Sequence, residues 1–168
     1  MDGDKVLEEL RNIYQIVNGQ IVFIESKNGG LVVFNVAMIT ILLSSNLITN
    51  WDFKVAVIGL LISCVIGLYS FAPISYKCKR VKVIDYWNDS LIYFRNIAKY
   101  DSRDSKKYIQ HLCHGMAINE GIADNELANS YAQEIIILSQ IIVIKNTAFR
   151  YAEIISMISL ALFVIKIM

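Results

Sequence analysis

The stretch HLCHG holds the side chains of this sequence that are best able to bind a metal ion, namely His111, Cys113 and His114. On a helix these close neighbours point in different directions, so they cannot all reach one ion. His111 and His114 lie three residues apart and share a face, but two ligands without a further pair do not form a zinc site. We therefore expect a partly exposed structural role for this stretch, and no metal.

Short motifs that indicate catalysis do not occur in the sequence. It has no glycine-rich phosphate-binding loop, no HExxH or GxSxG pattern and no paired carboxylates. We expect no catalytic residues and no cofactor, so an enzyme is the less favoured class. The formal net charge of +1 gives no general attraction to nucleic acid, and we expect no nucleic-acid partner.

Two uninterrupted apolar runs stand out in the first half of the chain, at residues 31–48 and 55–74, and neither contains a charged side chain. As helices, at about 1.5 Å per residue, each reaches roughly the 30 Å thickness of a bilayer's hydrocarbon core. Composition agrees, because 55% of the residues are hydrophobic and only 18% are charged. The runs predict a transmembrane helical hairpin in an all-α membrane protein.

The remaining segments also have helical patterns, and nothing alternates with a period of two. We expect an amphipathic cytoplasmic helix at residues 1–30 and a cytoplasmic helical region at 75–147. Within that region the patterns predict helices over 86–100, over 106–116 and from about 125. Residues 148–168 predict a C-terminal hydrophobic helix, which spans the bilayer, re-enters it or packs along the hairpin, with a span favoured. No flexible linker divides the chain, so residues 1–168 are expected to form a single domain.

Positive charge is concentrated directly after the second apolar run, at Lys77, Lys79, Arg80 and Lys82. The link between the two runs holds only one acid and one base. By the positive-inside rule the basic cluster is cytoplasmic, so the link faces out and both flanking regions face in. The sequence therefore predicts a multi-pass protein with a cytoplasmic N-terminus.

The N-terminal segment has a heptad pattern, in which apolar residues alternate at spacings of three and four. Its members are Leu7, Leu10, Tyr14, Val17, Ile21 and Ile24. The same spacing places Asn35 on one face of the first span, where an amide in lipid seeks a hydrogen-bonding partner on another helix. Gly29 and Gly30 permit a bend between the two parts, so we leave their continuity open.

Small residues form one ridge on the second span, at Gly59, Ser63 and Gly67. Such a ridge lets another helix approach closely. Together with the heptad seam through Leu10, Val17 and Ile24, it predicts tight packing, either within one chain or between copies in a homo-oligomer.

Three stretches, in order along the chain, resemble one family. The stretch VFIESKNGGLVVFNVAMITILL resembles the start of bacterial Pycsar effector transmembrane proteins, where an acid-x-lysine pair on a helix enters the first span. Glu25 and Lys27 occupy those two places, with Glu25 standing where an aspartate is usual.

The other two stretches cover the second half of the chain. SLIYFRNIAKYDSRDSKKYIQHL is similar to the family's tyrosine-phenylalanine segment, with Tyr93 and Phe94 in its positions and Arg95-Asn96 in place of a glycine-aspartate step. ADNELANSYAQEIIILSQIIVIKNTAFRYAEI resembles the family's final long helix. The positions that match there are Leu127, Gln133, Ser139, Lys145 and Tyr151.

The resemblance implies an antiphage effector in the bacterial inner (cell) membrane. In that role a separate cyclase makes a cyclic pyrimidine mononucleotide on infection, cyclic CMP (cCMP) or cyclic UMP (cUMP). The effector senses this nucleotide and impairs the membrane, which leads to growth arrest or cell death. The implied partners are the cyclic nucleotide, the lipid bilayer and further copies of the chain.

A site for such a nucleotide needs a cation for the phosphate and an aromatic face for the base. Tyr93, Phe94 and Arg95 supply both, and the further cationic candidates are Lys99, Lys145 and Arg150. The alternative is structural, with Phe94 in the core and Arg95 as a solvated or membrane-proximal charge.

Two other functions remain open on the sequence. One is a membrane toxin that is gated by a protein partner or needs no ligand. The other is a structural or regulatory subunit of a membrane complex that docks through the N-terminal seam. Gene neighbourhood distinguishes them, because an adjacent nucleotidyl cyclase favours the nucleotide-gated effector.

Overall fold

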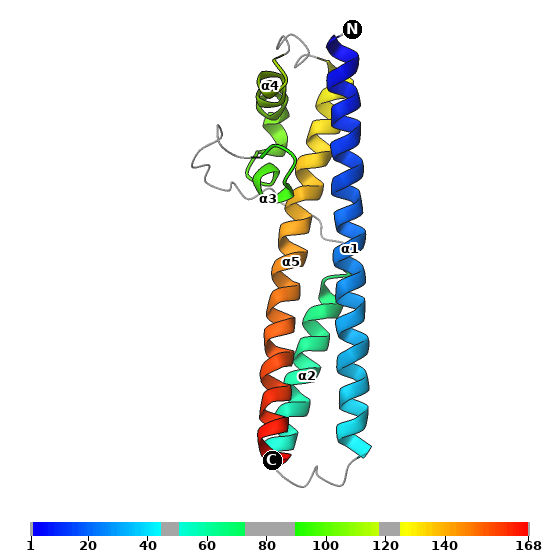
Figure 1. The fold of residues 1–168 in the computed structure, drawn as a ribbon, viewed down its shortest axis with the longest axis vertical. Coiled ribbons are helices and arrows are strands. Elements are labelled where there is room, and N and C mark those ends of the chain that lie inside the picture. Colours follow the sequence, from blue (N-terminus) through cyan, green and yellow to red (C-terminus); the bar gives the residue numbers. More distant parts are fainter. Residues whose placement is uncertain (1, 45–50, 73–89, 118–124, 168) are drawn as a thin grey trace. The chain divides into compact units, whose positions relative to one another are not determined.

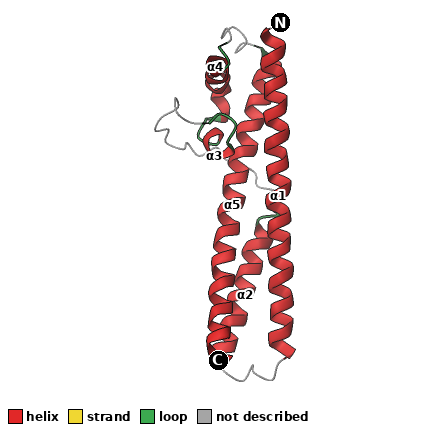
Figure 2. Cartoon of the chain, in the orientation of Figure 1, coloured by secondary structure: helices red, strands yellow, loops and turns green. Residues whose placement is uncertain are grey.

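The computed structural model describes residues 2–44, 51–72, 90–117 and 125–167, and these residues form helices and turns with no strand among them (Figure 2). The prediction of an all-α fold is confirmed. In chain order, as labelled in Figure 1, the elements are α1 (Asp2–Ser44), α2 (Trp51–Tyr69), α3 (Phe94–Ile97), the 3-10 turn η2 (Ser102–Asp104), α4 (Ser105–Gly115) and α5 (Glu126–Ile167). The basic cluster at residues 77–82 lies outside the described residues.

The two long helices are continuous where the sequence suggested boundaries. α1 has 43 residues and passes through Gly29 and Gly30 as regular helix, so the expected border between residues 1–30 and 31–48 is not a break in structure. α5 has 42 residues and joins the segments expected at 125–147 and 148–168.

The second predicted span, residues 55–74, is displaced in the structure, because α2 begins at Trp51 and ends at Tyr69. After it the backbone N–H groups of Ser70, Phe71 and Ala72 each bond to the carbonyl three residues earlier, at 3.0 to 3.2 Å. These tighter turns finish the helix. Ala72 precedes a proline, and that position disfavours helical geometry.

The chain forms two compact units. Unit 1 consists of Met1–Val22 and Ile74–Ile144, and unit 2 consists of Phe23–Pro73 and Lys145–Met168. Each of the long helices α1 and α5 therefore contributes one part to each unit.

In unit 1 the helix expected over residues 86–100 is wrong for its described part, because only Phe94–Ile97 is helical between residues 90 and 100. Side chains from α4 and α5 bind backbone carbonyls of this segment. The Tyr108 hydroxyl donates at 2.9 Å to the Leu91 carbonyl, which a longer helix would use itself, and the Gln140 amide donates to the carbonyls of Ala98 at 3.3 Å and Tyr100 at 2.9 Å. α4, by contrast, lies within one residue of its prediction at both ends.

The heptad seam of α1 packs inside the chain. Leu10 and Val17 are completely buried in unit 1, and Ile24 is buried in unit 2. The second buried row contains Val6 and Ile13 and so lies one residue earlier than predicted, while Leu7, Tyr14 and Ile21 are only half-buried.

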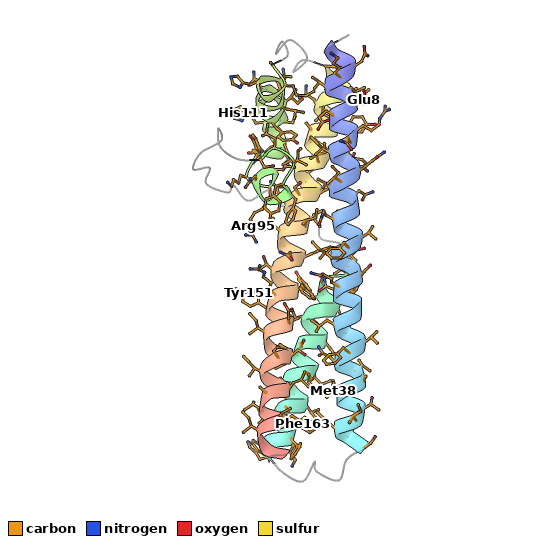
Figure 3. All side chains as sticks on the ribbon, in the orientation of Figure 1. Glu8, Met38, Arg95, His111, Tyr151 and Phe163 are labelled. Atoms are coloured by element: carbon orange, nitrogen blue, oxygen red, sulfur yellow. The ribbon has the colours of Figure 1, made fainter. Side chains whose placement is uncertain are left out.

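Unit 2 contains three helical segments, from α1, α2 and α5. Its apolar cluster consists of Ile39, Leu42, Phe53, Leu60 and Cys64, with Met38 and Phe163 packed against it; the last two are labelled in Figure 3. The rings of Phe53 and Phe163 meet edge to face, with centroids 5.6 Å apart.

The outer surface of unit 2 is apolar as well. Val33, Val65, Met157 and Ile165 are 66 to 69% exposed, and each of the three helices carries further exposed aliphatic residues. A helix with one face in water needs regular polar residues on that face. α1 and α5 are each long and apolar enough to cross a membrane, whereas the apolar helix at Phe53–Tyr69 is shorter. Unit 2 has the surface expected of a membrane-embedded part.

The close approach of α1 to α2 gives a first prediction. A Cβ atom at Gly67 would lie 2.8 Å from Val32 Cγ2, whereas a Cβ at Gly30 would meet nothing within 4 Å. Gly67→Leu should therefore force the helices apart and destabilise the protein by about 1 to 3 kcal/mol. Gly30→Ala should stabilise it by up to about 1 kcal/mol, because alanine favours helix.

Thermal unfolding in detergent, followed by circular dichroism, compares the two variants. The close packing of α2 on α1 at Gly67 is contradicted if Gly67→Leu unfolds at the same temperature as the unsubstituted protein while Gly30→Ala unfolds at a higher temperature.

Candidate functional site

Polar side chains occupy the interior of unit 2, where apolar packing is the usual solution. All three helices contribute to this group, which we call the polar interior. Two members on α1 lie seven residues apart, which puts both on one helix face, and the same spacing separates one member on α2 from another in the turn that follows it. Its members, all 0 to 4% exposed, are Asn28, Asn35, Ser63, Ser70, Ser156 and Ser159.

Asn35 is the centre of the polar interior. Its amide nitrogen donates to Ser63 Oγ at 2.7 Å, and Ser156 Oγ donates to its carbonyl oxygen at 2.6 Å. Ser63 Oγ in turn donates to the backbone carbonyl of Ala152 at 2.7 Å. Asn35 therefore has a hydrogen-bonding partner on another helix, as the sequence predicted, and the bonds link α1, α2 and α5 of one chain.

Asn28 forms a second level, one heptad before Asn35. Its amide nitrogen donates to Ser70 Oγ at 2.6 Å. Its carbonyl oxygen is buried and has no hydrogen-bond partner within the described part of the chain. An acceptor buried in this way is costly unless water or another group satisfies it.

An ion pair forms the third level. Lys145 Nζ lies 2.5 Å from Glu25 Oε1, and the lysine side chain is 8% exposed against 39% for the glutamate. Glu25 and Lys27 were noted in the sequence as two positions of an acid-x-lysine motif, and the ion-pair partner of Glu25 in the structure is Lys145. The Lys27 ammonium instead lies over the rings of Phe23 and Phe149, at 4.9 and 5.4 Å from their centroids.

Three of the predicted nucleotide-binding residues come together in unit 1. The rings of Tyr93 and Phe94 are tilted against each other with centroids 4.8 Å apart. Tyr93 is 46% exposed and Phe94 is half-buried. Arg95 is exposed and forms no ion pair with any residue that the structure describes. Lys99 is half-buried nearby in sequence.

The other two candidates belong to unit 2. Arg150 is exposed, whereas Lys145 is buried against Glu25. An ammonium that already has a carboxylate partner is a poorer phosphate ligand than a free one. The six predicted residues are thus divided between the units, and Lys145 has a structural partner.

The HLCHG stretch lies on α4 and is part of the packing of unit 1. His111 Nδ1 and the Tyr100 hydroxyl are hydrogen-bonded at 2.8 Å, and Cys113 is buried. Tyr100 also packs edge to face on Tyr108, at 5.2 Å between centroids. Burial raises the pKa of Tyr108 above its ordinary range, and the nearby Tyr100 and Glu9 raise that pKa further. In the described ranges no three His, Cys, Asp or Glu side chains gather as a metal site would require.

Two features of the structure were missed by sequence reasoning. Gln140 and Ser139 are buried, and each keeps a polar atom without a partner among the described residues. The only signal for Gln140 was its position inside an apolar run, whereas Ser139 was noted in the sequence only as a match to the family's final helix. An open groove of about 480 Å³ also lies along the first turns of α1. Because nearly all of its lining comes from that one helix, nothing encloses a ligand there; the lining residues are Lys5, Glu8, Glu9, Arg11, Asn12, Gln15 and Met116.

Comparison with known proteins gives the family. A model of the Pycsar effector protein domain matches residues 9–168, which include almost all of α1 and the whole of α5. The chain belongs to the Pycsar effector family. No curated protein and no solved structure matches it. The resemblance noted in the sequence is confirmed, and this Pycsar effector takes its place among antiphage defence effectors, a family that is not known as a family of enzymes.

The ion pair of Glu25 and Lys145 gives a second prediction, which is that the loss of Glu25 destabilises this Pycsar effector more than the loss of Lys145. Glu25→Gln leaves a buried ammonium unpaired, and breaking a buried pair in this way costs about 3 to 5 kcal/mol. Lys145→Met leaves a carboxylate that is already 39% exposed and can be hydrated, so its cost should be smaller. We expect Glu25→Gln to lower the unfolding temperature more than Lys145→Met does.

Glu153→Gln is the matched control, because Glu153 is an exposed acid of unit 2 and its loss should change little. The three variants are compared by thermal unfolding in lipid discs. If Glu25→Gln and Lys145→Met lower the unfolding temperature equally, or if neither lowers it, the ion pair with a buried lysine is contradicted.

Proposed function

We propose that this Pycsar effector is embedded in the bacterial inner membrane through unit 2 and impairs that membrane when a cyclic pyrimidine mononucleotide binds. The observation that carries the proposal is the construction of unit 2, in which apolar outer surfaces enclose a polar interior. A part built in this way is stable in lipid, because its outer surface is apolar, and it contains hydrophilic groups that can be hydrated if the helices separate. The family supplies the ligand class, because Pycsar effectors respond to cyclic pyrimidine nucleotides.

For the ligand we propose a site in unit 1 that includes Tyr93, Phe94 and Arg95. An exposed guanidinium without an ion-pair partner among the described residues is able to bind phosphate oxygens in a bidentate way. The exposed ring of Tyr93, next to Phe94, offers a face for a pyrimidine base. Lys99 of unit 1 is a further cationic candidate, whereas Arg150 and Lys145 belong to unit 2, and Glu25 already engages Lys145.

Self-association remains part of the proposal, with one constraint from the structure. Leu10, Val17 and Ile24 are buried within a single chain, as are Asn35 and Ser63. Copies of the effector would therefore meet through other surfaces, such as the exposed apolar faces of unit 2.

A third prediction tests the activity itself. Proteoliposomes are loaded with potassium, and a voltage-sensitive dye follows the loss of the potassium diffusion potential. cCMP or cUMP should collapse the potential, whereas cyclic AMP should not. If neither pyrimidine nucleotide changes the potential, the nucleotide-gated function is wrong.

The same assay tests Arg95. Arg95→Ala removes a charge-assisted hydrogen bond worth about 1.5 to 3 kcal/mol, so the half-maximal nucleotide concentration should rise at least tenfold. Arg103→Ala is the matched control, because Arg103 is another exposed arginine of unit 1, with a side chain 69% exposed. A titration that is unchanged in Arg95→Ala would remove Arg95 from the site.

A fourth prediction concerns orientation, with the N-terminus and the region 75–147 in the cytoplasm and the link after α1 outside. It uses single cysteines at two exposed positions, Lys106→Cys and Trp51→Cys, in a chain whose native cysteines are replaced. An impermeant thiol reagent added to intact cells should label Trp51→Cys and spare Lys106→Cys until the cells are opened. The reverse pattern would invert the topology.

A further inference from the structure

The polar interior of unit 2 and the ion pair of Glu25 and Lys145 place polar groups at several levels along the helices. At about 1.5 Å per residue, Lys145 and Ser159 of α5 lie about 21 Å apart, which is roughly two thirds of a 30 Å hydrocarbon core. Along α1 the ion pair at Glu25 comes first, the bond of Asn28 next and the bonds of Asn35 after it.

Cohesion alone does not require these groups. Hydrogen bonds between membrane helices contribute on average about 0.6 kcal/mol, and close packing of small residues holds such helices together without them. A buried acceptor without a partner, such as Asn28 Oδ1, even costs free energy. This acceptor and its neighbours are groups that water satisfies readily.

Apolar side chains fill the rest of the interior of unit 2, and we call this group the apolar closure. Beyond Asn35 along α1, Ile39 and Leu42 pack with Phe53, Leu60 and Phe163. A hydrophobic constriction of this kind excludes water and therefore ions. In the structure, unit 2 is polar along one part of its interior and sealed along the other.

The outward-facing residues next to the polar interior are apolar. Val65 lies two residues from Ser63 and Met157 lies next to Ser156, and both are 66% exposed. At these levels the interior offers an ion oxygen ligands that can replace part of its hydration shell, whereas the neighbouring outer surface does not.

We infer that, in the activated effector, small monovalent ions cross the membrane along the polar interior of unit 2, lined by Asn28, Asn35, Ser63 and Ser156 after the apolar closure parts. This inference rests on the proposed function and gives the form of the damage, which is a narrow conducting path and not a general rupture of the bilayer. Carbonyl and hydroxyl oxygens of the four residues replace part of the hydration shell of the passing ion.

Cysteine accessibility with matched pairs provides the experiment. Ser63→Cys and Ser156→Cys place a thiol in the polar interior with almost no change in size, and Val65→Cys and Met157→Cys place one on the lipid-facing surface. Each is made in the full chain with the native cysteines replaced, and is reconstituted in proteoliposomes that hold potassium and a trapped dye of about 600 Da. A small, charged methanethiosulfonate reagent is added with or without cCMP or cUMP.

With nucleotide, the potassium potential should collapse while the dye stays trapped. The interior thiols should react at least tenfold faster than without nucleotide, and their modification should reduce the potassium leak. The lipid-facing thiols should react slowly in both states and leave the leak unchanged.

Two results overturn the inference while the proposed function stands, namely release of dye together with potassium, and a nucleotide-induced leak during which the interior thiols stay unreactive. If neither nucleotide causes any leak from the unsubstituted protein, the proposed function fails as well. Circular dichroism and thermal unfolding of each single variant before labelling identify a variant that fails to fold, and the interior thiol on the other helix then provides the comparison.

Discussion

The structure of unit 2 depends on one constraint, which is that a polar group in lipid must find its partner inside the protein. Asn35 is completely buried in a segment whose surroundings are otherwise apolar. Its amide can be satisfied only by side chains on the neighbouring helices, and Ser63 and Ser156 provide both partners. Because the glycine ridge of α2 allows the helices to come close, short serine side chains reach the amide.

The same bonds fix the register of the three helices. A Cβ atom at Gly59 would meet Ser159 of α5, whereas one at Gly67 would meet Val32 of α1, so the two glycines let α2 approach two different helices. A slide of α2 along α1 would separate Asn35 from Ser63 and Asn28 from Ser70 and leave buried donors and acceptors without partners. The polar groups therefore favour this register over a shifted one.

Sequence patterns were reliable where the relevant interaction lies within one helix or on one helix face. Hydrophobic runs predicted the apolar helices, and the heptad spacing carried Leu10, Val17, Ile24 and Asn35 to the buried face of α1. Spacing carries no information on which distant residue will face a given side chain. The partner of Glu25 lies 120 positions away, at Lys145, and the acid-x-lysine motif could not indicate it. The prediction of a helix over 86–100 was wrong for a related reason, because Tyr108, from outside the segment, donates to the Leu91 carbonyl.

Two lysines of unit 2 are stabilised in different ways. Lys27 is exposed, and its ammonium lies over the rings of Phe23 on α1 and Phe149 on α5. The side chain of Lys145 is buried, so its ammonium needs a carboxylate, which Glu25 supplies. Both contacts join α1 to α5, one through an aromatic ring and the other through an ion pair, so both are sensitive to a change in the separation of these helices.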